Sequence, residues 1–348
     1  MTTARYARWD GAGRPFAVVE IGVPDSLRPG EVLVRVDLAT LCGSDLHTVH
    51  GRRASPAPSV LGHEQVGTVL RTAPGLRCAD GTLVTPGLRV VWSVTASCGR
   101  CDRCVRDMPQ KCAGLRKYGH EPLDPGAPLV GGFATHCVLL PGTTIVAVPD
   151  GLPDVVASPA SCATATVAAA LAAAPGDLSG RRVLVAGAGM LGVTAVAMAA
   201  ERGAHVVAVD PHPARRARAA RFGAAETAAA PAPGAFDVAV ELSGASASVA
   251  ACLSALDIGG VAVLAGSVSP GEPVPIDPER VVRGLHTVTG VHNYRPADLQ
   301  TAVDFLAAHQ DRYPFHELVA GRHALSELDS AFAAAAAGTA PRQAVLPG

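Results

Sequence analysis

Four cysteines lie close together in the segment 98–112, which reads CGRCDRCVRDMPQKC. Cys98, Cys101, Cys104 and Cys112 follow the spacing C-x2-C-x2-C-x7-C. Four thiolates so close together suit tetrahedral Zn²⁺, and because protein ligands take every position, none remains open for water or substrate. An iron–sulfur cluster or a redox dithiol is the alternative. The spacing therefore predicts a structural zinc site that fixes its loop, so a metal with a chemical role must bind elsewhere.

A second group of metal-binding residue types occurs earlier in the chain. The stretch LCGSDLH at 41–47 contains Cys42, and GHEQVG at 62–67 contains His63 and Glu64. Thiolate and imidazole are both zinc ligands, and a catalytic zinc needs three protein ligands with a fourth position open. These two motifs therefore predict part of a working metal site whose third ligand lies elsewhere.

A glycine-rich turn follows the apolar run RVLVA and opens a helical stretch. Its residues are Gly187, Gly189, Met190, Leu191 and Gly192. In G-x-G-x-x-G the first glycine permits the turn, the second lets the backbone approach a pyrophosphate, and the third allows close packing of helix on sheet. Such a loop predicts a dinucleotide site.

The next apolar run ends at Asp210, which is placed to accept hydrogen bonds from a ribose 2′-hydroxyl and to repel a 2′-phosphate. This favours NAD over NADP. Arg215 and Arg216 lie just beyond. Either arginine could soften the preference, and Arg215 is counted among the cofactor-binding candidates, although both fit solvated helix charges.

The motifs fall on two kinds of predicted structure. Residues 1 to about 150 hold short β-type runs broken by Gly and Pro, typical of a partly closed antiparallel barrel with long loops. From 155 onward, short apolar strands alternate with helical stretches, which predicts a parallel, doubly wound α/β sheet. The expected domains are residues 1–154 and 155–288, with 289–348 returning to the first domain.

Length and composition narrow the classes of protein. A chain of 348 residues favours two domains, and a net charge of −1 lacks the basic footprint of a nucleic-acid binder or a protein held on anionic lipid. Nine cysteines, four of them clustered, favour metal binding over disulfides, and no signal-type start is visible, so a cytoplasmic location is expected. The uncharged stretch 183–200 fits a strand, a turn and a helix better than a membrane span. The expected partners are small molecules, with no nucleic acid and no membrane.

Together these motifs, in this order, resemble the zinc-dependent medium-chain alcohol dehydrogenases. The residues that carry the resemblance are Cys42, Ser44, Asp45 and His47, the G-H-E-x-x-G at 62–67, the cysteine quartet and the glycine loop. The resemblance implies a GroES-like β-rich catalytic domain and a Rossmann NAD-binding domain. It also implies Cys162, in ASPASCATATVAAAL, as the third ligand of a catalytic zinc, two zinc ions per chain, and a homodimer or homotetramer.

The same resemblance implies roles around the metal. Ser44, a cofactor ribose hydroxyl and His47 would relay a proton, and Asp45 would hydrogen-bond the free nitrogen of His63. Glu64 would be a charge beside the metal or a transient ligand. The implied reaction is reversible hydride transfer between an alcohol and nicotinamide.

The substrate is predicted only from local likeness. The runs 117–121, 131–143 and 162–171 resemble a branch associated with phosphonate metabolism, which suggests a hydroxyalkyl phosphonate held by Arg52 and Arg53, unless these are solvated loop charges. A polyol, sugar or amino-acid alcohol is the alternative substrate. A non-catalytic zinc-ribbon protein with an NAD-sensing half is the alternative from another class, and a count of two zincs rather than one would favour the enzyme.

Overall fold

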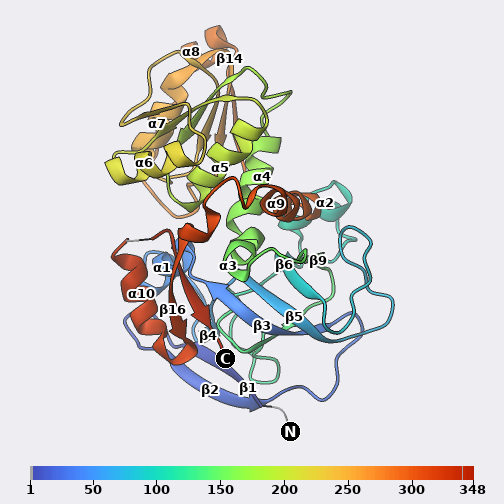
Figure 1. Cartoon of the computed structure of the whole chain (residues 1–348). Coiled ribbons are helices and arrows are strands. Elements are labelled where there is room, and N and C mark those ends of the chain that lie inside the picture. Colours follow the sequence, from blue (N-terminus) through green and yellow to red (C-terminus); the bar gives the residue numbers. More distant parts are fainter. Residues whose placement is uncertain (1–2, 339) are drawn as a thin grey trace. The chain divides into compact units, whose positions relative to one another are not determined.

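The structure is a computed structural model that describes residues 3–338 and 340–348. The chain forms two compact units. The first contains the chain up to Cys162 together with Arg295–Gln310 and Phe315–Gly348, and the second contains Ala163–Tyr294 and Asp311–Pro314. In Figure 1 the red strand β16 (Val319–Ala324), from the last part of the chain, accordingly lies among the blue strands of the first unit.

Strands dominate the first unit. They are β1 Thr3–Trp9, β2 Ala17–Gly22, β3 Val32–Thr40, β4 Ser59–Val60, β5 Gln65–Thr72, β6 Arg89–Ala96, β7 Arg116–Lys117, β8 His136–Leu139, β9 Thr143–Ala147, β16 and β17 Arg342–Leu346. A small sheet has the order β2-β1-β4, and a larger one has the order β16-β17-β3-β5-β6-β7, with β8 on β3 and β9 on β6. All these pairings are antiparallel except β16 with β17. The predicted antiparallel, β-rich domain is therefore confirmed.

Short helices and single turns connect these strands. They are α1 Gly43–Val49, α2 Asp102–Val105, η1 Pro109–Lys111, α3 Asp154–Ala157, η2 Ser158–Ser161, α9 Pro296–His309, η3 Phe315–Leu318, η4 Leu325–Glu327 and α10 Leu328–Ala336. Helix α9 begins with Pro296 in its first turn, where the missing N–H costs nothing. Most of the unit's length is thus strand and loop, as its many Gly and Pro residues indicate.

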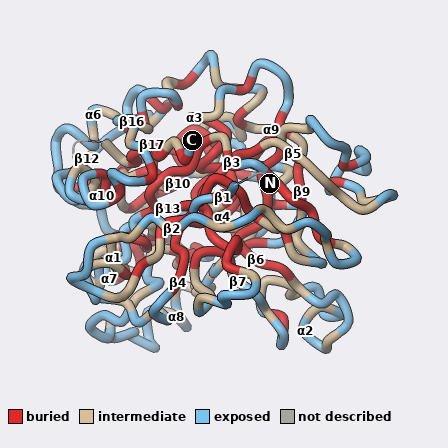
Figure 2. Tube along the Cα trace, turned by 90° about the horizontal axis from the view of Figure 1, so that it is seen from below, coloured by how far each residue is buried: buried red, intermediate tan, exposed pale blue. Residues whose placement is uncertain are grey.

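The core of the first unit lies between its two sheets and α10. Trp92, Tyr118, Phe133 and Leu139 are almost completely buried there, and Phe332 of α10 packs edge-on to Phe133 at 6.0 Å between ring centroids. Figure 2 shows the buried residues along strands such as β3 and the exposed ones on segments such as α2. The C-terminal segment therefore completes the apolar core of the unit that begins the chain.

The second unit is a parallel sheet with helices. Its elements are α4 Ala163–Ala172, β10 Arg182–Ala186, α5 Met190–Glu201, β11 His205–Val209, α6 Pro213–Arg221, β12 Glu226–Ala228, β13 Phe236–Glu241, α7 Ser246–Ala255, β14 Leu256–Leu264, α8 Pro278–Gly284 and β15 Thr287–Gly290. The strand order is β12-β11-β10-β13-β14-β15, and every pairing is parallel. This is the 3-2-1-4-5-6 order of the Rossmann fold, so the predicted fold class is confirmed.

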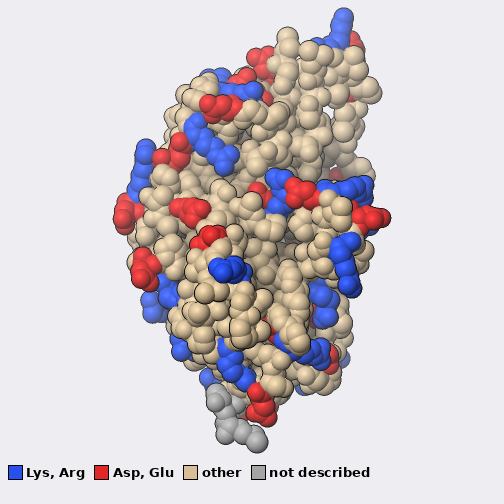
Figure 3. Space-filling view, turned by 90° about the vertical axis from the view of Figure 1, so that its right-hand side faces the viewer, with Lys and Arg blue, Asp and Glu red and all other residues tan. Residues whose placement is uncertain are grey.

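The helices of the described residues and the charges on the surface bear on whether the chain spans a membrane and how its charge is distributed. No single helix among them is long and apolar enough to cross a membrane, and only the helices on either side of Cys162 reach that length and composition when taken together. The stretch 183–200 forms most of β10 and α5. On the face drawn in Figure 3, Lys and Arg alternate with Asp and Glu among uncharged residues, in keeping with the net charge of −1.

Candidate functional site

Three donor side chains from separate segments of the first unit meet. Cys42 follows β3 and precedes α1, His63 lies between β4 and β5, and Cys162 follows η2. One ligand atom from each lies within 4.8 Å of the others, and the two sulfur atoms are 4.0 Å apart. A thiol pair and an imidazole at this spacing could hold a metal ion, and the donor set is one that zinc accepts.

The protonation of these donors also suits a cation. The hydrogen bond from Cys162 lowers the pKa of Cys42 well below that of a free thiol, and the same contact raises the pKa of Cys162. Burial disfavours protonated His63, yet Asp45 and the Cys42 thiolate raise the pKa of its imidazole to about 10. Without a metal, protonated His63 therefore balances part of the negative charge of the Cys42 thiolate and Asp45, and a metal ion would replace the protons on His63 and Cys162.

Asp45 orients two of the three donors. Its Oδ1 lies 3.2 Å from Nδ1 of His63, and its Oδ2 accepts a 3.0 Å hydrogen bond from the backbone N–H of Cys42. Because Nδ1 faces the carboxylate, Nε2 is the nitrogen left for a metal. Ser44 Oγ lies 3.1 Å from that Nε2. The structure thus brings Ser44 and Asp45 to the group, as the resemblance implies.

Glu64 is not free beside the metal group, because it forms a buried ion pair that the sequence did not predict. Arg342 in β17 donates from Nε and Nη2 to the two carboxylate oxygens, each at 2.7 Å, and its Nη2 lies 3.6 Å from Cys42 Sγ. Thr40 Oγ1 donates a third bond to Glu64 at 2.9 Å. Burial raises the pKa of Glu64, whereas the charge of Arg342 lowers it. The carboxylate is therefore held by Arg342 and Thr40.

No sequence signal could have indicated Arg342. It lies 278 positions from Glu64 and in a short strand near the end of the chain. It joins the site because β17 pairs with β3 immediately before Cys42, through Ala344 and Thr40. Only sheet pairing made this contact.

His47, Arg52 and Arg53 lie together at the end of α1. The backbone N–H groups of Arg52 and Arg53 both donate to the carbonyl oxygen of His47, at 2.9 and 3.1 Å. Burial lowers the pKa of His47, and the charges of Arg52 and Arg53 lower it further. Neutral His47 is therefore favoured near pH 7, the form that can accept a proton.

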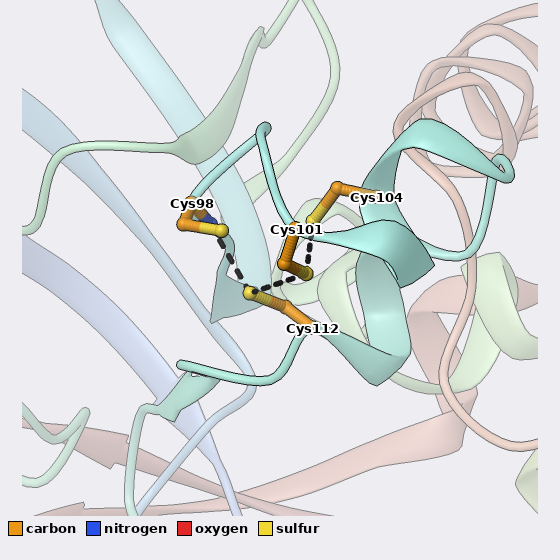
Figure 4. Close-up of side chains that lie close together, drawn as sticks. All are labelled: Cys98, Cys101, Cys104 and Cys112. Carbon is orange, nitrogen blue, oxygen red and sulfur yellow. Dashed lines mark hydrogen bonds between the residues drawn. The ribbon is translucent and has the colours of Figure 1, made fainter.

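The cysteine quartet forms the second group that could hold a metal. The sulfur atoms of Cys98, Cys101, Cys104 and Cys112 lie within 4.8 Å of one another, as the converging side chains in Figure 4 show. Backbone N–H groups reach two of these sulfurs: that of Cys98 donates to Cys112 at 3.3 Å, and that of Ala113 donates to Cys101 at 3.4 Å. This donation lowers the pKa of Cys101 to about 6. The loop therefore stabilises the thiolate of Cys101, whereas burial raises the pKa of Cys104.

In the second unit the glycine loop connects β10 to α5. Gly187 has φ +94°, and a Cβ added to Gly192 would lie 1.8 Å from the carbonyl oxygen of Gly187. Gly189 is the N-cap of α5, which begins at Met190 and Leu191. The close approach that only glycine allows is thus the helix–turn packing expected of this motif.

Asp210 closes the same loop from the end of β11. Its buried carboxylate accepts hydrogen bonds from the backbone N–H of Ala188 and of His212, both at 2.9 Å. Arg215 Nη1 is 3.7 Å from the carboxylate, and Arg216 Nη1 donates to the backbone carbonyl of Asp210 at 2.8 Å. The two arginines therefore lie beside the carboxylate.

Family models match most of this architecture. Residues 28–150 match the "Alcohol dehydrogenase GroES-like domain", and residues 191–308 match "Zinc-binding dehydrogenase". An L-threonine 3-dehydrogenase of Anaeromyxobacter dehalogenans (strain 2CP-C) is 32% identical over 87% of this chain and 88% of its own length. The chain belongs to the zinc-dependent medium-chain dehydrogenase family. It is therefore an oxidoreductase, and not the non-catalytic zinc-ribbon protein considered above.

Other relatives and solved structures agree with this assignment. An alcohol dehydrogenase of Geobacillus stearothermophilus is 30% identical over 84% of this chain and 86% of its own length. The crystal structure of an alcohol dehydrogenase from Thermotoga maritima has a TM-score of 0.92 and 26% identity, with both chains covered completely. The crystal structure of a zinc-binding dehydrogenase from Sinorhizobium meliloti 1021, bound to NADP, has a TM-score of 0.86 and 25% identity, again over the whole of both chains. NAD(P)-dependent dehydrogenase activity follows from this membership, whereas the phosphonate substrate stays a prediction.

Proposed function

We propose that this medium-chain dehydrogenase oxidises and forms alcohols at a zinc ion held by Cys42, His63 and Cys162. The convergence of these three donor atoms within 4.8 Å, from segments far apart in the chain, is the observation that carries the proposal. Three protein ligands with a fourth position open is the arrangement of catalytic zinc. When bound, zinc supplies a positive charge that lowers the pKa of an alcohol hydroxyl.

The side chains around these donors would orient them and move the proton. Asp45 fixes the His63 tautomer from 3.2 Å, and Glu64, neutralised by Arg342, adds no net charge to the site. Ser44 and His47 would carry the substrate proton outward, and the lowered pKa of His47, caused by burial and then by Arg52, keeps it ready to accept that proton near neutral pH.

The second metal group is proposed to be structural. Its four sulfurs supply every ligand of a tetrahedral zinc, so Cys98, Cys101, Cys104 and Cys112 would leave no position for a substrate. The cysteine lobe, residues 98–112, is also linked to the start of α9 by an ion pair between Asp107 and Arg295 at 3.0 Å. A metal here would fix the fold of the lobe and take no part in chemistry.

NAD is the proposed preferred cofactor, bound at Gly187, Gly189, Met190, Leu191 and Gly192. Support comes from the buried Asp210 carboxylate at the end of β11, which would repel a 2′-phosphate. Arg215 is exposed over 47% of its side chain and lies 3.7 Å from that carboxylate, so it offsets part of the repulsion.

We also propose that the protein is a cytoplasmic homo-oligomer. Large apolar side chains that are exposed in the second unit support association: Ile258, Ile276, Val282 and Leu285. None of the nine cysteines, all of which lie in the described part of the chain, forms a disulfide, which is the state favoured in the cytoplasm. Sedimentation velocity at micromolar concentration tests the association, and a single monomeric species would contradict it.

Metal analysis combined with initial rates tests the catalytic proposal. The wild-type protein should contain two zincs per chain and should reduce NAD, tested beside NADP, with members of an alcohol panel that includes hydroxyalkyl phosphonates. Cys162→Ser should lower the count towards one and abolish turnover. Cys78→Ser, which changes a buried thiol outside both metal groups, is the matched control and should keep both zincs and the activity. Full activity and two zincs in Cys162→Ser would refute the proposed ligand set.

A further inference from the structure

A short segment after the cysteine lobe packs directly against the candidate catalytic metal group. A Cβ added to Gly119 would lie 2.5 Å from the carbonyl oxygen of Gly62, the residue before His63. The His120 ring is 5.0 Å from the His63 ring, centroid to centroid. The turn that follows strand β7 therefore packs against one side of His63.

The two residues of β7 differ in their partners. Side chains of successive strand residues point to opposite faces. Arg116 is half exposed, with 52% of its side chain accessible, and forms an ion pair with Glu121 at 2.6 Å. Lys117 is half-buried and lies within electrostatic range of the Cys42 and Cys162 thiols. Lys117 is thus on the metal-group side, and Arg116 is not.

Arg53 adds a second cation to this place. Its charge acts on Lys117, on His120 and on His47. Within the described part of the chain, neither Lys117 nor Arg53 forms an ion pair with a carboxylate. Burial, and then the charge of Arg53, lower the pKa of Lys117, whereas the nearby Cys162 and Cys42 thiols raise it.

The remaining charges of the site do not compensate these two cations. A divalent metal and two thiolates sum to zero, and Glu64 with Arg342 also sums to zero. Asp45 supplies one negative charge and faces His63. His120 donates from Nδ1 to the Tyr118 carbonyl at 2.9 Å, and burial lowers its pKa, so it adds a neutral imidazole. A half-buried cation pair of this kind is stabilised by a bound anion.

We propose that the enzyme selects alcohols that carry an anionic group, a carboxylate or a phosphonate, and that Lys117 and Arg53 bind this group while the hydroxyl lies at the metal. This inference rests on the proposed alcohol dehydrogenase function and names its substrate class. Lys117 is a specificity-determining residue, and His120 lies beside it against the His63 ring.

The test compares anionic and neutral alcohols of similar length with the zinc-loaded enzyme. The panel is 3-hydroxybutyrate, 2-hydroxypropylphosphonate and 2-pentanol. A charge-assisted hydrogen bond corresponds to about a 10- to 100-fold change in kcat/KM. Lys117→Met should lose that factor on the better anionic substrate and less than about threefold on 2-pentanol, whereas Lys117→Arg should keep most of the preference. Arg116→Met, its neighbour in β7, is the matched control and should leave both unchanged.

Equilibrium binding gives a readout that does not depend on turnover. Calorimetric titration with butyrate and with propylphosphonate should show binding to the wild-type enzyme that weakens about 10-fold or more in Lys117→Met and not in Arg116→Met. The ratio of the two ligands decides which anion is preferred. If the wild-type enzyme oxidises 2-pentanol and Lys117→Met loses the same factor of kcat/KM on all three alcohols, the anion site is overturned and the dehydrogenase proposal stands. If a fully metallated enzyme binds these anions but oxidises no alcohol, the dehydrogenase proposal is overturned and the anion site stands.

Discussion

Replacing Arg342 by Met should destabilise the first unit strongly, because it leaves a buried carboxylate without its cation. The Glu64 side chain is 0% exposed and that of Arg342 is 6% exposed, with both nitrogen–oxygen distances at 2.7 Å. After the replacement only the bond from Thr40 remains. Removing one partner of such a pair costs about 3–5 kcal/mol of the free energy of unfolding.

A matched ion pair on the surface supplies the control. Arg35 lies 2.7 Å from Asp37, the same distance, but 49% of the Arg35 side chain is exposed. Water already solvates both charges there, so Arg35→Met should cost only about 0.2–1 kcal/mol. Burial, together with the second bond that Arg342 makes to its carboxylate, would account for the difference between the two arginines.

Urea-induced unfolding followed by tryptophan fluorescence is the assay, with zinc content measured alongside. The chain has two tryptophans, Trp9 and Trp92, and both are buried in the first unit at 3% and 0% exposure, so the signal reports that unit. The double variant Glu64→Gln/Arg342→Met should recover most of the loss, since no unpaired charge remains. The reasoning is refuted if Arg342→Met costs no more than Arg35→Met, or if the double variant is no more stable than the single one.

Two further outcomes are expected. Arg52→Gln removes a positive charge that lowers the pKa of His47, so that pKa should rise and the acidic limb of the kcat/KM profile for a neutral alcohol should move to higher pH; an unmoved limb would exclude His47 as the proton acceptor. Cys112→Ser should remove one zinc per chain and lower the unfolding temperature, because the loop loses a buried ligand. The enzyme that remains folded should keep its substrate preference in initial-rate measurements. An unchanged zinc content would argue against the structural site.

Local patterns were sufficient for most of the elements. The apolar runs at 182–189, 205–210 and 236–244 predict β10, β11 and β13, and the glycine loop falls where a strand and a helix meet. These elements are specified by period and by residue type, since a buried parallel strand needs a continuous run of Val, Leu and Ala and a phosphate-binding turn needs glycine. The short strands β4, β7 and β12 gave no such signal, because two or three residues carry no period.

Some metal ligands were predicted from their spacing or residue type, and one was predicted only from the family resemblance. The quartet at 98–112 is local, so spacing alone brought it together, and its sulfurs do converge. Cys42 and His63 were recognisable by residue type, but Cys162 came only from the family resemblance, since no spacing rule connects residues 120 positions apart.

Residue types, periodicity and motif spacing were enough to predict the two-part α/β and β-rich organisation, the dinucleotide loop and the kinds of metal ligand. Tertiary structure decided which charges face these ligands. Arg342 meets Glu64 because β17 pairs with β3, and the segment 117–120 lies against His63 because Gly119 packs on Gly62. Such contacts join distant residues through sheet register and close backbone approach, and these depend on the packing of the whole unit rather than on any local pattern.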